Sequence, residues 1–231
     1  MGLKTVLAFD FGASSGRAVL AQFDGKQISS REIHRFSNDP VMVRGTLYWD
    51  VLRLFHEIKQ GITKALHSGG FDCISIDTWG VDIGLIGFDG ELVQNPVHYR
   101  DQRTTGMMEE VCSTISPEEL YAHTGIQFMR INTLFQLYYL AHYRPELLER
   151  TDKLVMITDV FNYFLTGEIK TEYTNASTSQ MLNANTGTWD TALLERLGIP
   201  TRILPEIIPA GSVYGTLSDE LCEELGCPKG P

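Results

Sequence analysis

The sequence predicts a single α/β domain in which helices surround a mixed sheet. The first third of the chain consists of short apolar runs separated by Gly/Ser and Asp-Gly turns, which are typical of strands. The second half carries repeated signals for helix starts and stops. With 231 residues and 43% hydrophobic residues, the chain can bury a substantial core as one domain.

Three antiparallel strands are expected at the N-terminus. The apolar run Thr5–Phe9 precedes a Gly/Ser turn. The runs Arg17–Phe23 and Gln27–Phe36 are separated by an Asp-Gly dipeptide, which favours a hairpin. Tight turns on both sides of the middle run indicate neighbours that pair antiparallel.

A helix and further strands follow. Apolar residues recur at helical spacing from Val51 to Leu66, and Asp50 is suited to the N-cap. We then expect a strand over Asp72–Thr78 and a hairpin formed by Ile83–Phe88 and Leu92–Tyr99.

The second half of the chain is expected to be mostly helical. Its helices are indicated by N-cap residues, apolar spacing and Gly or Pro stops. They are expected from Ser116, over Thr133–Tyr143, over Asp159–Leu165, over Asp190–Leu197 and over Ser218–Leu225.

Composition and charge narrow the class of function. A formal net charge of −10 disfavours binding to nucleic acid, because an acidic protein repels phosphate backbones. The four cysteines lack the spacing of a zinc site and are expected to be reduced thiols in a cytoplasmic protein. The N-terminus is typical of a strand rather than a signal peptide, and no apolar run is long enough to cross a membrane.

The octet DFGASSGR at residues 10–17 is the strongest local motif. Here Asp10 closes a strand and a turn of small residues follows. Backbone N–H groups and serine hydroxyls in such a turn can bind phosphate oxygens, and Asp10 can hold a divalent cation against them. Gly12 and Gly16 would permit positive φ and close approach of a ligand. A plain hairpin turn would show the same composition.

The same octet contains G-x-S-x-G, the pattern of the nucleophile elbow in α/β-hydrolases. That elbow requires a helix after the serine, whereas RAVLAQF at residues 17–23 predicts a strand. A serine hydrolase is therefore a weak alternative, and a strand after Gly16 would exclude it.

The hexapeptide DTWGVD at residues 77–82 closes another strand. Sugars are held by carboxylates that accept from hydroxyls and by aromatic rings that contact C–H faces, so Asp77, Trp79 and Asp82 suit a sugar site. Gly80 would let a ligand approach the backbone. A buried tryptophan beside a polar turn would give the same pattern.

The cluster YRDQR at residues 99–103 gathers donors and acceptors where the chain leaves another strand. A solvated, salt-bridged loop would have the same composition.

Together, these motifs resemble the FGGY family of carbohydrate kinases, in the branch whose sugar is L-rhamnulose. The stretches REIHRF, VHYRD, HTGIQF, NTLFQL and EYTNASTSQ are similar as well, in the same order, and extend the resemblance over residues 4–190. The resemblance implies an actin-like ATPase fold built from ribonuclease-H-like domains. It also implies transfer of the γ-phosphate of ATP to the 1-hydroxyl of L-rhamnulose, with Mg²⁺ as cofactor.

The resemblance assigns roles to individual residues. It implies that Asp10 lies near the metal, and that Gly80, with Trp79 beside it, contacts the sugar. The residues themselves add Asp77 as a third sugar ligand. The residues that it places around the ATP phosphates are Ala13, Ser14, Ser15, Gly16 and Arg17.

One expected family segment is absent from the sequence. The resemblance implies a general-base Asp in a segment similar to SHDTASA, which does not occur up to Pro231. We therefore expect residues 1–231 to be a sugar-binding N-terminal domain that is incomplete at its C-terminal end, with the second, ATP-binding domain absent. Phosphoryl transfer needs groups from both domains, so we expect this chain alone to be inactive.

Two alternatives stay open. The first is that the parent enzyme is an FGGY kinase for another ketose or polyol, since one changed hydroxyl contact alters specificity. The chain can also be a non-catalytic sugar-binding module on the same fold. A missing closing strand would expose a sheet edge, so self-association through that edge is expected.

Overall fold

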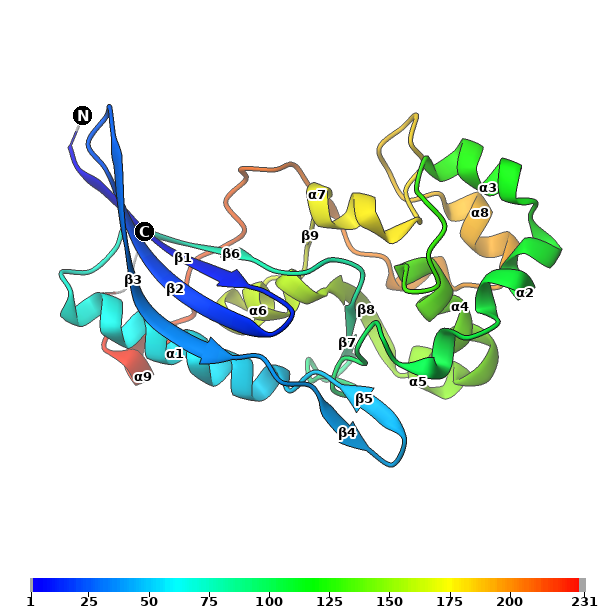
Figure 1. Ribbon diagram of the computed structural model, residues 1–231, viewed down its shortest axis with the longest axis horizontal. Coiled ribbons are helices and arrows are strands. Elements are labelled where there is room, and N and C mark those ends of the chain that lie inside the picture. Colours follow the sequence, from blue (N-terminus) through cyan, green and yellow to red (C-terminus); the bar gives the residue numbers. More distant parts are fainter. Residues whose placement is uncertain (1, 229–231) are drawn as a thin grey trace.

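A four-stranded mixed sheet forms one side of the computed structural model, which describes residues 2–228 (Figure 1). The strand order is β3-β2-β1-β6. Strands β1 (Lys4–Phe11), β2 (Ser15–Phe23) and β3 (Ile28–Ser37) are antiparallel neighbours, and β6 (Cys73–Asp77) runs parallel to β1. The mixed sheet and its three antiparallel strands confirm the expectation from the sequence.

Strand β2 begins at Ser15, directly after the Gly/Ser turn, and pairs with β1 along its whole length. A nucleophile elbow would have a helix at this position. The serine hydrolase alternative is therefore wrong.

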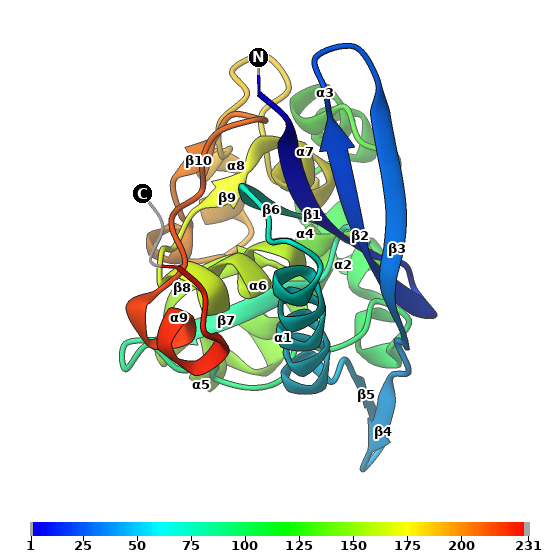
Figure 2. The ribbon, with the colours of Figure 1, turned by 90° about the vertical axis from the view of Figure 1, so that its left-hand side faces the viewer.

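Helix α1 (Val51–His67) covers one face of this sheet (Figure 2). Asp50 is its N-cap, as expected, and accepts from the backbone N–H of Arg53 at 3.2 Å. The helix lies close to the sheet because Gly61 has no Cβ, which would lie 2.6 Å from the ring of Phe9. Helices α6 (Ile157–Thr166) and α9 (Asp219–Leu225) pack into the same core.

The hairpin expected after β6 does not form. Its first strand is present as β7 (Ile83–Gly87), but residues 92–99 form no strand. Strand β7 pairs with the distant β8 (Thr151–Met156), not with residues 92–99. Residues 92–99 make only isolated bridges, at Leu92 and Val97. Pro96 lies within this segment and has no N–H to give to a ladder, which explains why no strand forms.

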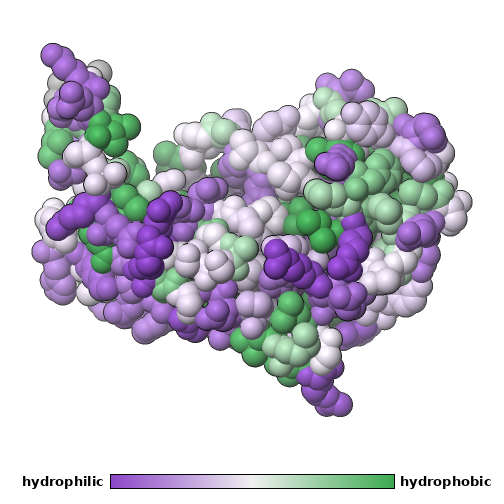
Figure 3. Space-filling model, in the orientation of Figure 1, coloured by the Kyte–Doolittle hydropathy of each residue, from purple (hydrophilic) through white to green (hydrophobic). Residues whose placement is uncertain are grey.

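Besides the β7–β8 pair, two short pairs of strands complete the β structure of the described residues. Strands β4 (Val41–Val43) and β5 (Thr46–Tyr48) form a protruding hairpin (Figure 1). Its β4 side chains are exposed and apolar, and they form a hydrophobic patch at the lower edge of the molecule in Figure 3. Strands β9 (Thr171–Glu172) and β10 (Ile207–Ile208) pair in parallel.

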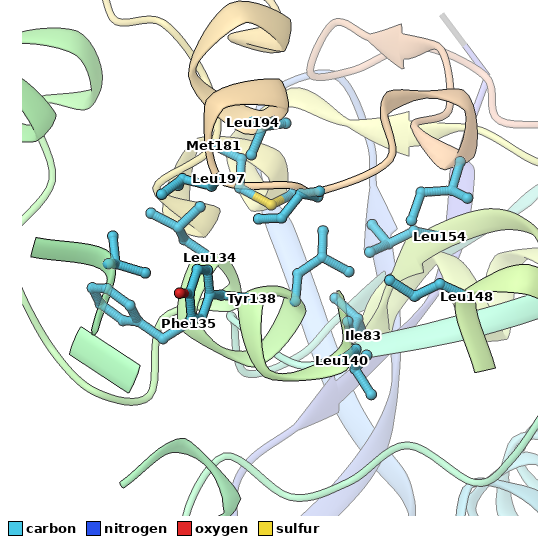
Figure 4. Packing of buried hydrophobic residues seen from close by; sticks show 14 of the residues in the cluster. Ile83, Leu134, Phe135, Tyr138, Leu140, Leu148, Leu154, Met181, Leu194 and Leu197 are labelled. Atoms are coloured by element: carbon cyan, nitrogen blue, oxygen red, sulfur yellow. The ribbon is translucent and has the colours of Figure 1, made fainter. Parts of the chain in front are cut away.

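The remaining helices form the other side of the molecule (Figure 1). They are α2 (Met107–Thr114), α3 (Pro117–Thr124), α4 (Thr133–Tyr143), α5 (Pro145–Glu149), α7 (Tyr173–Ala176) and α8 (Thr191–Arg196). Ser116, Asp190 and Ser218 cap α3, α8 and α9 as expected. Figure 4 shows the core here, where Leu134 and Tyr138 of α4 pack in one cluster with Leu194 of α8.

Within residues 2–228, no helix has the length and apolar character needed to cross a membrane. The four cysteines are free thiols.

Candidate functional site

The turn after β1 is exposed and is held from below by one buried amide. Gly12, Ala13 and Ser14 join β1 to β2 and are exposed. Asn38, which follows β3 and is only 2% exposed, donates from Nδ2 to the carbonyl oxygen of Gly12 at 2.8 Å. Its backbone N–H also donates to the carbonyl oxygen of Ser14 at 3.0 Å. These bonds fix the turn while leaving its outer surface open.

The two glycines of this turn do not adopt positive φ, contrary to the expectation. Gly16 is buried instead, and a Cβ at this position would lie 2.3 Å from the ring of Phe36. A Cβ at Gly12 would lie 3.2 Å from the carbonyl oxygen of Ser15. Close packing, and not a left-handed backbone, therefore explains glycine at position 16.

Asp10 and Arg17 are paired with each other. They lie opposite one another in the β1–β2 register, and Arg17 donates from Nη2 and Nε to Asp10 Oδ2 at 2.6 and 2.9 Å. Both side chains are about half exposed, at 47%. The carboxylate expected near the metal and the cation expected near the phosphates thus neutralise each other in this structure.

The parallel pairing of β1 with β6 brings the two sequence motifs together. Asp10 of β1 is the direct partner of Asp77, the last residue of β6. Paired residues on adjacent strands project from the same face of a sheet, and such strands lie about 5 Å apart. Because Asp77 is exposed, the octet and the hexapeptide form one continuous surface at this end of the sheet.

The loop after β6 contains a strained backbone. Val81 has φ +68°, which is rare for a β-branched residue. The N–H of Asp82 donates to the carbonyl oxygen of Gly80 at 3.0 Å, so the three residues form a tight γ-turn. The Val81 carbonyl oxygen accepts from Thr133 Oγ1 at 2.7 Å and from Gln136 Nε2 at 3.2 Å, and both donors lie on α4. The strain is therefore held by contacts from a distant helix.

Asp82 is the centre of a buried polar network. Its Oδ2 accepts from the indole Nε1 of Trp49 at 2.5 Å, from Trp79 Nε1 at 3.0 Å and from the Tyr99 N–H at 3.2 Å. Its Oδ1 accepts from Gln136 Nε2 at 3.0 Å. Burial raises the pKa of Asp82 to about 6, although these hydrogen bonds act in the opposite direction. With 0% exposure, Asp82 is not available to a sugar hydroxyl, and the expectation that both carboxylates bind sugar is wrong for this one.

An aromatic stack surrounds this carboxylate. The Trp49 ring lies 4.0 Å from the Trp79 ring and 4.0 Å from the His98 ring, centroid to centroid. Trp49 is fully buried, whereas Trp79 is partly exposed and is the member of the stack nearest to solvent. Burial and the nearby Arg100 lower the pKa of His98 to about 4, so its ring is neutral at pH 7.

The polar stretch at residues 172–177 lies across from this loop. Asn175 Nδ2 donates to Thr158 Oγ1 at 2.8 Å, and Thr158 Oγ1 lies 2.6 Å from Thr78 Oγ1. A Cβ at Gly80 would lie 3.1 Å from Thr178 Oγ1, so glycine keeps the backbone close to this wall.

The cluster at residues 99–103 turns inward and is not a solvated loop. Asp101 is buried and accepts from the backbone N–H of Leu47 at 2.8 Å. Arg103 donates to Gln136 Oε1 at 2.7 Å and so reaches the Asp82 network.

Sequence reasoning missed Trp49, Gln136 and Asn38. Gln136 lies within the NTLFQL stretch, but nothing in that stretch points to Asp82, and Trp49 and Asn38 have no motif around them. Each of the three reaches the site only through tertiary packing. In residues 2–228, no three His, Cys, Asp or Glu side chains are grouped so as to hold a metal ion.

Comparison with known proteins gives the family. Residues 5–230 match the N-terminal domain of the FGGY family of carbohydrate kinases. The chain therefore belongs to this family. The rhamnulokinase of Oceanobacillus iheyensis is 44% identical over 222 residues, which are 95% of this chain and 47% of that protein. The rhamnulokinase of Mannheimia succiniciproducens is 45% identical over 93% of this chain and 45% of its own length. The chain thus spans about half the length of these curated relatives.

Solved structures share the fold. Gluconate kinase from Lactobacillus acidophilus superimposes with a TM-score of 0.87 at 23% identity, over 99% of this chain and 46% of that one. Ligand-bound xylulose kinase from the same organism gives 0.86 at 23% identity, over 98% of this chain and 46% of that one. At this identity the likeness concerns the fold, and it confirms the actin-like, ribonuclease-H-like class.

Proposed function

We propose that this chain is the sugar-binding part of an ATP-dependent kinase that phosphorylates L-rhamnulose at its 1-hydroxyl. The observation that carries the proposal is the pairing of Asp10 with Asp77, because it makes a phosphate-type turn and a sugar-type loop adjoin at one sheet end. Rhamnulokinases at 44% and 45% identity support the choice of sugar.

The sugar is assigned to the loop after β6. Asp77 is exposed and accepts sugar hydroxyls, while the partly exposed ring of Trp79 offers an apolar surface to C–H groups. Gly80 permits close approach to the backbone. These three residues orient the ketose so that its terminal hydroxyl faces the neighbouring turn.

The phosphates are assigned to the exposed turn after β1. Ser14 and Ser15 contribute hydroxyl donors, and Ala13 and Gly16 contribute backbone N–H groups. Arg17 contributes charge once it leaves Asp10, because phosphate oxygens compete for the guanidinium. Binding of nucleotide is therefore coupled to opening of the Asp10–Arg17 ion pair.

A divalent cation, Mg²⁺ in this proposal, fits the donor chemistry of this edge. Asp10 and Asp77 are carboxylates at paired positions, and Mg²⁺ is typically held by one or two carboxylates together with substrate phosphates. When bound, the ion neutralises charge on the phosphates. Asp10 is the residue that would hold it, after release from Arg17.

The proposal is tested by isothermal titration of L-rhamnulose into the protein, with L-xylulose, D-xylulose and glycerol as comparison ligands. Phosphoryl transfer from MgATP is measured for the same set with the full-length protein that carries this chain. Selective binding and turnover of L-rhamnulose are expected. Selectivity for another ligand would identify a kinase for another ketose or polyol. If the full-length protein binds the sugar without turnover, the chain is part of a non-catalytic sugar-binding module.

A further inference from the structure

The buried network below the loop has a function of its own in the site. We propose that Asp82 is a positioning residue for the sugar: its carboxylate clamps the Trp79 ring and the strained Gly80–Asp82 turn in the geometry that receives the ligand. This inference rests on the proposed function, because it concerns the same site.

The first argument is the orientation of Trp79. The Asp82 carboxylate accepts from the indole N–H groups of Trp79 and of Trp49 through the same oxygen, Oδ2. One face of the Trp79 ring lies against Trp49, at 4.0 Å and an interplanar angle of 33°. The exposed part of Trp79 is therefore its other face or its edge. A hydrogen bond to Nε1 and contact on one face together leave the ring little freedom to rotate.

The second argument is the strained backbone. The left-handed conformation of Val81 is unfavourable for a β-branched residue, so it persists only because surrounding contacts hold it. Gln136 Nε2 donates both to the Val81 carbonyl oxygen and to Asp82 Oδ1, so one amide ties the strained carbonyl to the carboxylate. Arg103 fixes that amide from its other end, at Gln136 Oε1. The same Nε2 also donates to the Ile131 carbonyl oxygen at 3.0 Å, so Asp82 Oδ1 is one of three acceptors that hold this amide, and it is the one that ties the strained turn to the Trp79 ring.

The third argument is chemical specificity. Four donors converge on Asp82, so the position requires two acceptor oxygens and no donor. Asparagine has almost the same shape, but its NH₂ group would face an indole N–H or the amide of Gln136. The substitution Asp82→Asn therefore keeps the volume and breaks the clamp.

The test uses a Trp189→Phe background, in which Trp49 and Trp79 are the two remaining tryptophans. Trp189 lies with the helical core and donates to Pro205, away from this network. Near-ultraviolet circular dichroism reports the fixed geometry of the tryptophan pair, and calorimetry reports L-rhamnulose affinity. In D82N we expect the signal of the pair to collapse and Kd to rise at least about tenfold. The D77N variant, at the other end of the loop, should weaken binding without changing the signal of the pair.

A second variant covers the case in which D82N does not fold. Trp49→Phe keeps an aromatic ring against Trp79 and removes the shortest donor to Asp82. In W49F/W189F, Trp79 is the one tryptophan left, so its fluorescence anisotropy reports the mobility of its ring. We expect the time-resolved anisotropy of W49F/W189F to show a fast local decay that a fixed ring would lack, and Kd to be raised several-fold relative to W189F.

The outcomes separate this inference from the proposed function. If D82N and W49F leave both the tryptophan signals and Kd unchanged, Asp82 is only a buried structural group and the inference is overturned. If the unsubstituted protein binds no sugar, the proposed function and the sugar-positioning role fail together. If it binds sugar and the variants bind equally well, the inference alone fails.

Discussion

The two segments that meet at the end of the sheet are built in opposite ways. The turn after β1 is exposed, and its charged residues satisfy each other through the Asp10–Arg17 pair. The loop after β6 is anchored by a fully buried carboxylate and carries a strained residue at Val81. A surface ion pair is easily opened by a competing phosphate, whereas a buried network holds its geometry before any ligand arrives. One segment is thus suited to a charged ligand that forms new ion pairs, and the other to a neutral ligand that needs a preformed surface.

The two segments are expected to differ most in how much the loss of a carboxylate lowers the free energy of unfolding. Asp82→Ala removes the acceptor shared by four donors, and the bonds from Trp49 and Gln136 are buried, so we expect the free energy of unfolding to fall by about 3–5 kcal/mol. The matched control is Asp77→Ala, at the exposed end of the same loop, for which we expect a change below about 1 kcal/mol. Urea denaturation measures both. Equal losses would contradict the distinction between a buried anchor and an exposed ligand group.

A buried carboxyl group next to the loop after β6 makes the stability of the protein depend on pH. Burial raises the pKa of Asp159 from 3.8 to about 7, and this residue neighbours Thr158 in the wall across from the loop. A raised carboxyl pKa means that the folded state holds the proton longer, so unfolding free energy falls as pH rises from about 4 to about 7. His98, with its lowered pKa, acts in the opposite direction between about 4 and 6.5.

The Asp159→Asn variant isolates this contribution. Relative to the unsubstituted chain, its stability should rise by about 2–4 kcal/mol between pH 4 and pH 7.5. Comparing the two proteins at each pH removes the contribution of His98. A difference that stays constant across this range would show that Asp159 titrates normally in the folded state.

A smaller effect is expected at the turn after β1. Gly16→Ala places a Cβ against the Phe36 ring and should cost about 1–3 kcal/mol. Adding Phe36→Leu should restore part of this loss, because the smaller side chain makes room. Gly12→Ala, where the nearest atom is a backbone oxygen at 3.2 Å, is the milder case and should cost less than Gly16→Ala. Loss of phosphate affinity in G16A without loss of stability would instead support a ligand-contact role for this glycine.

The smallest stability effect is expected for the exposed ion pair. Asp10→Asn removes one partner of a half-exposed pair and should cost less than about 1 kcal/mol. The same change frees Arg17, so affinity for inorganic pyrophosphate measured without a divalent cation should rise. Unchanged pyrophosphate affinity would contradict the coupling between the ion pair and phosphate binding.

Local signals in the sequence predicted much of the fold. Asp50, Ser116 and Ser218 act as N-caps where expected, because a cap depends only on neighbours along the chain. The strand expected at 92–99 was wrong, since its pattern gave no sign that β7 pairs instead with β8, more than sixty residues away.

The site was predicted only in part, for a related reason. Both ligand-type segments stood out in the sequence, because small and polar residues at strand ends are a local pattern. The network under the loop was not predicted, although Arg103 and Gln136 lie in stretches that were noted in the sequence. Trp49, Gln136 and Arg103 come from three separate segments that only the fold brings together. Glycine at position 16 was assigned to backbone freedom, because the approach of Phe36 cannot be read from the chain.

A two-dimensional ¹H–¹⁵N NMR titration observes the turn after β1 and the loop after β6 in one sample. L-Rhamnulose should shift the Trp79 indole and Gly80 amide signals, while pyrophosphate with Mg²⁺ should shift the amides of Ala13 to Gly16. The Trp189 indole should move with neither ligand. Shifts in these two separate, adjoining sets would support one site made of a sugar loop and a phosphate turn. If L-rhamnulose shifts neither the Trp79 indole signal nor the Gly80 amide signal, the loop after β6 is not the sugar site.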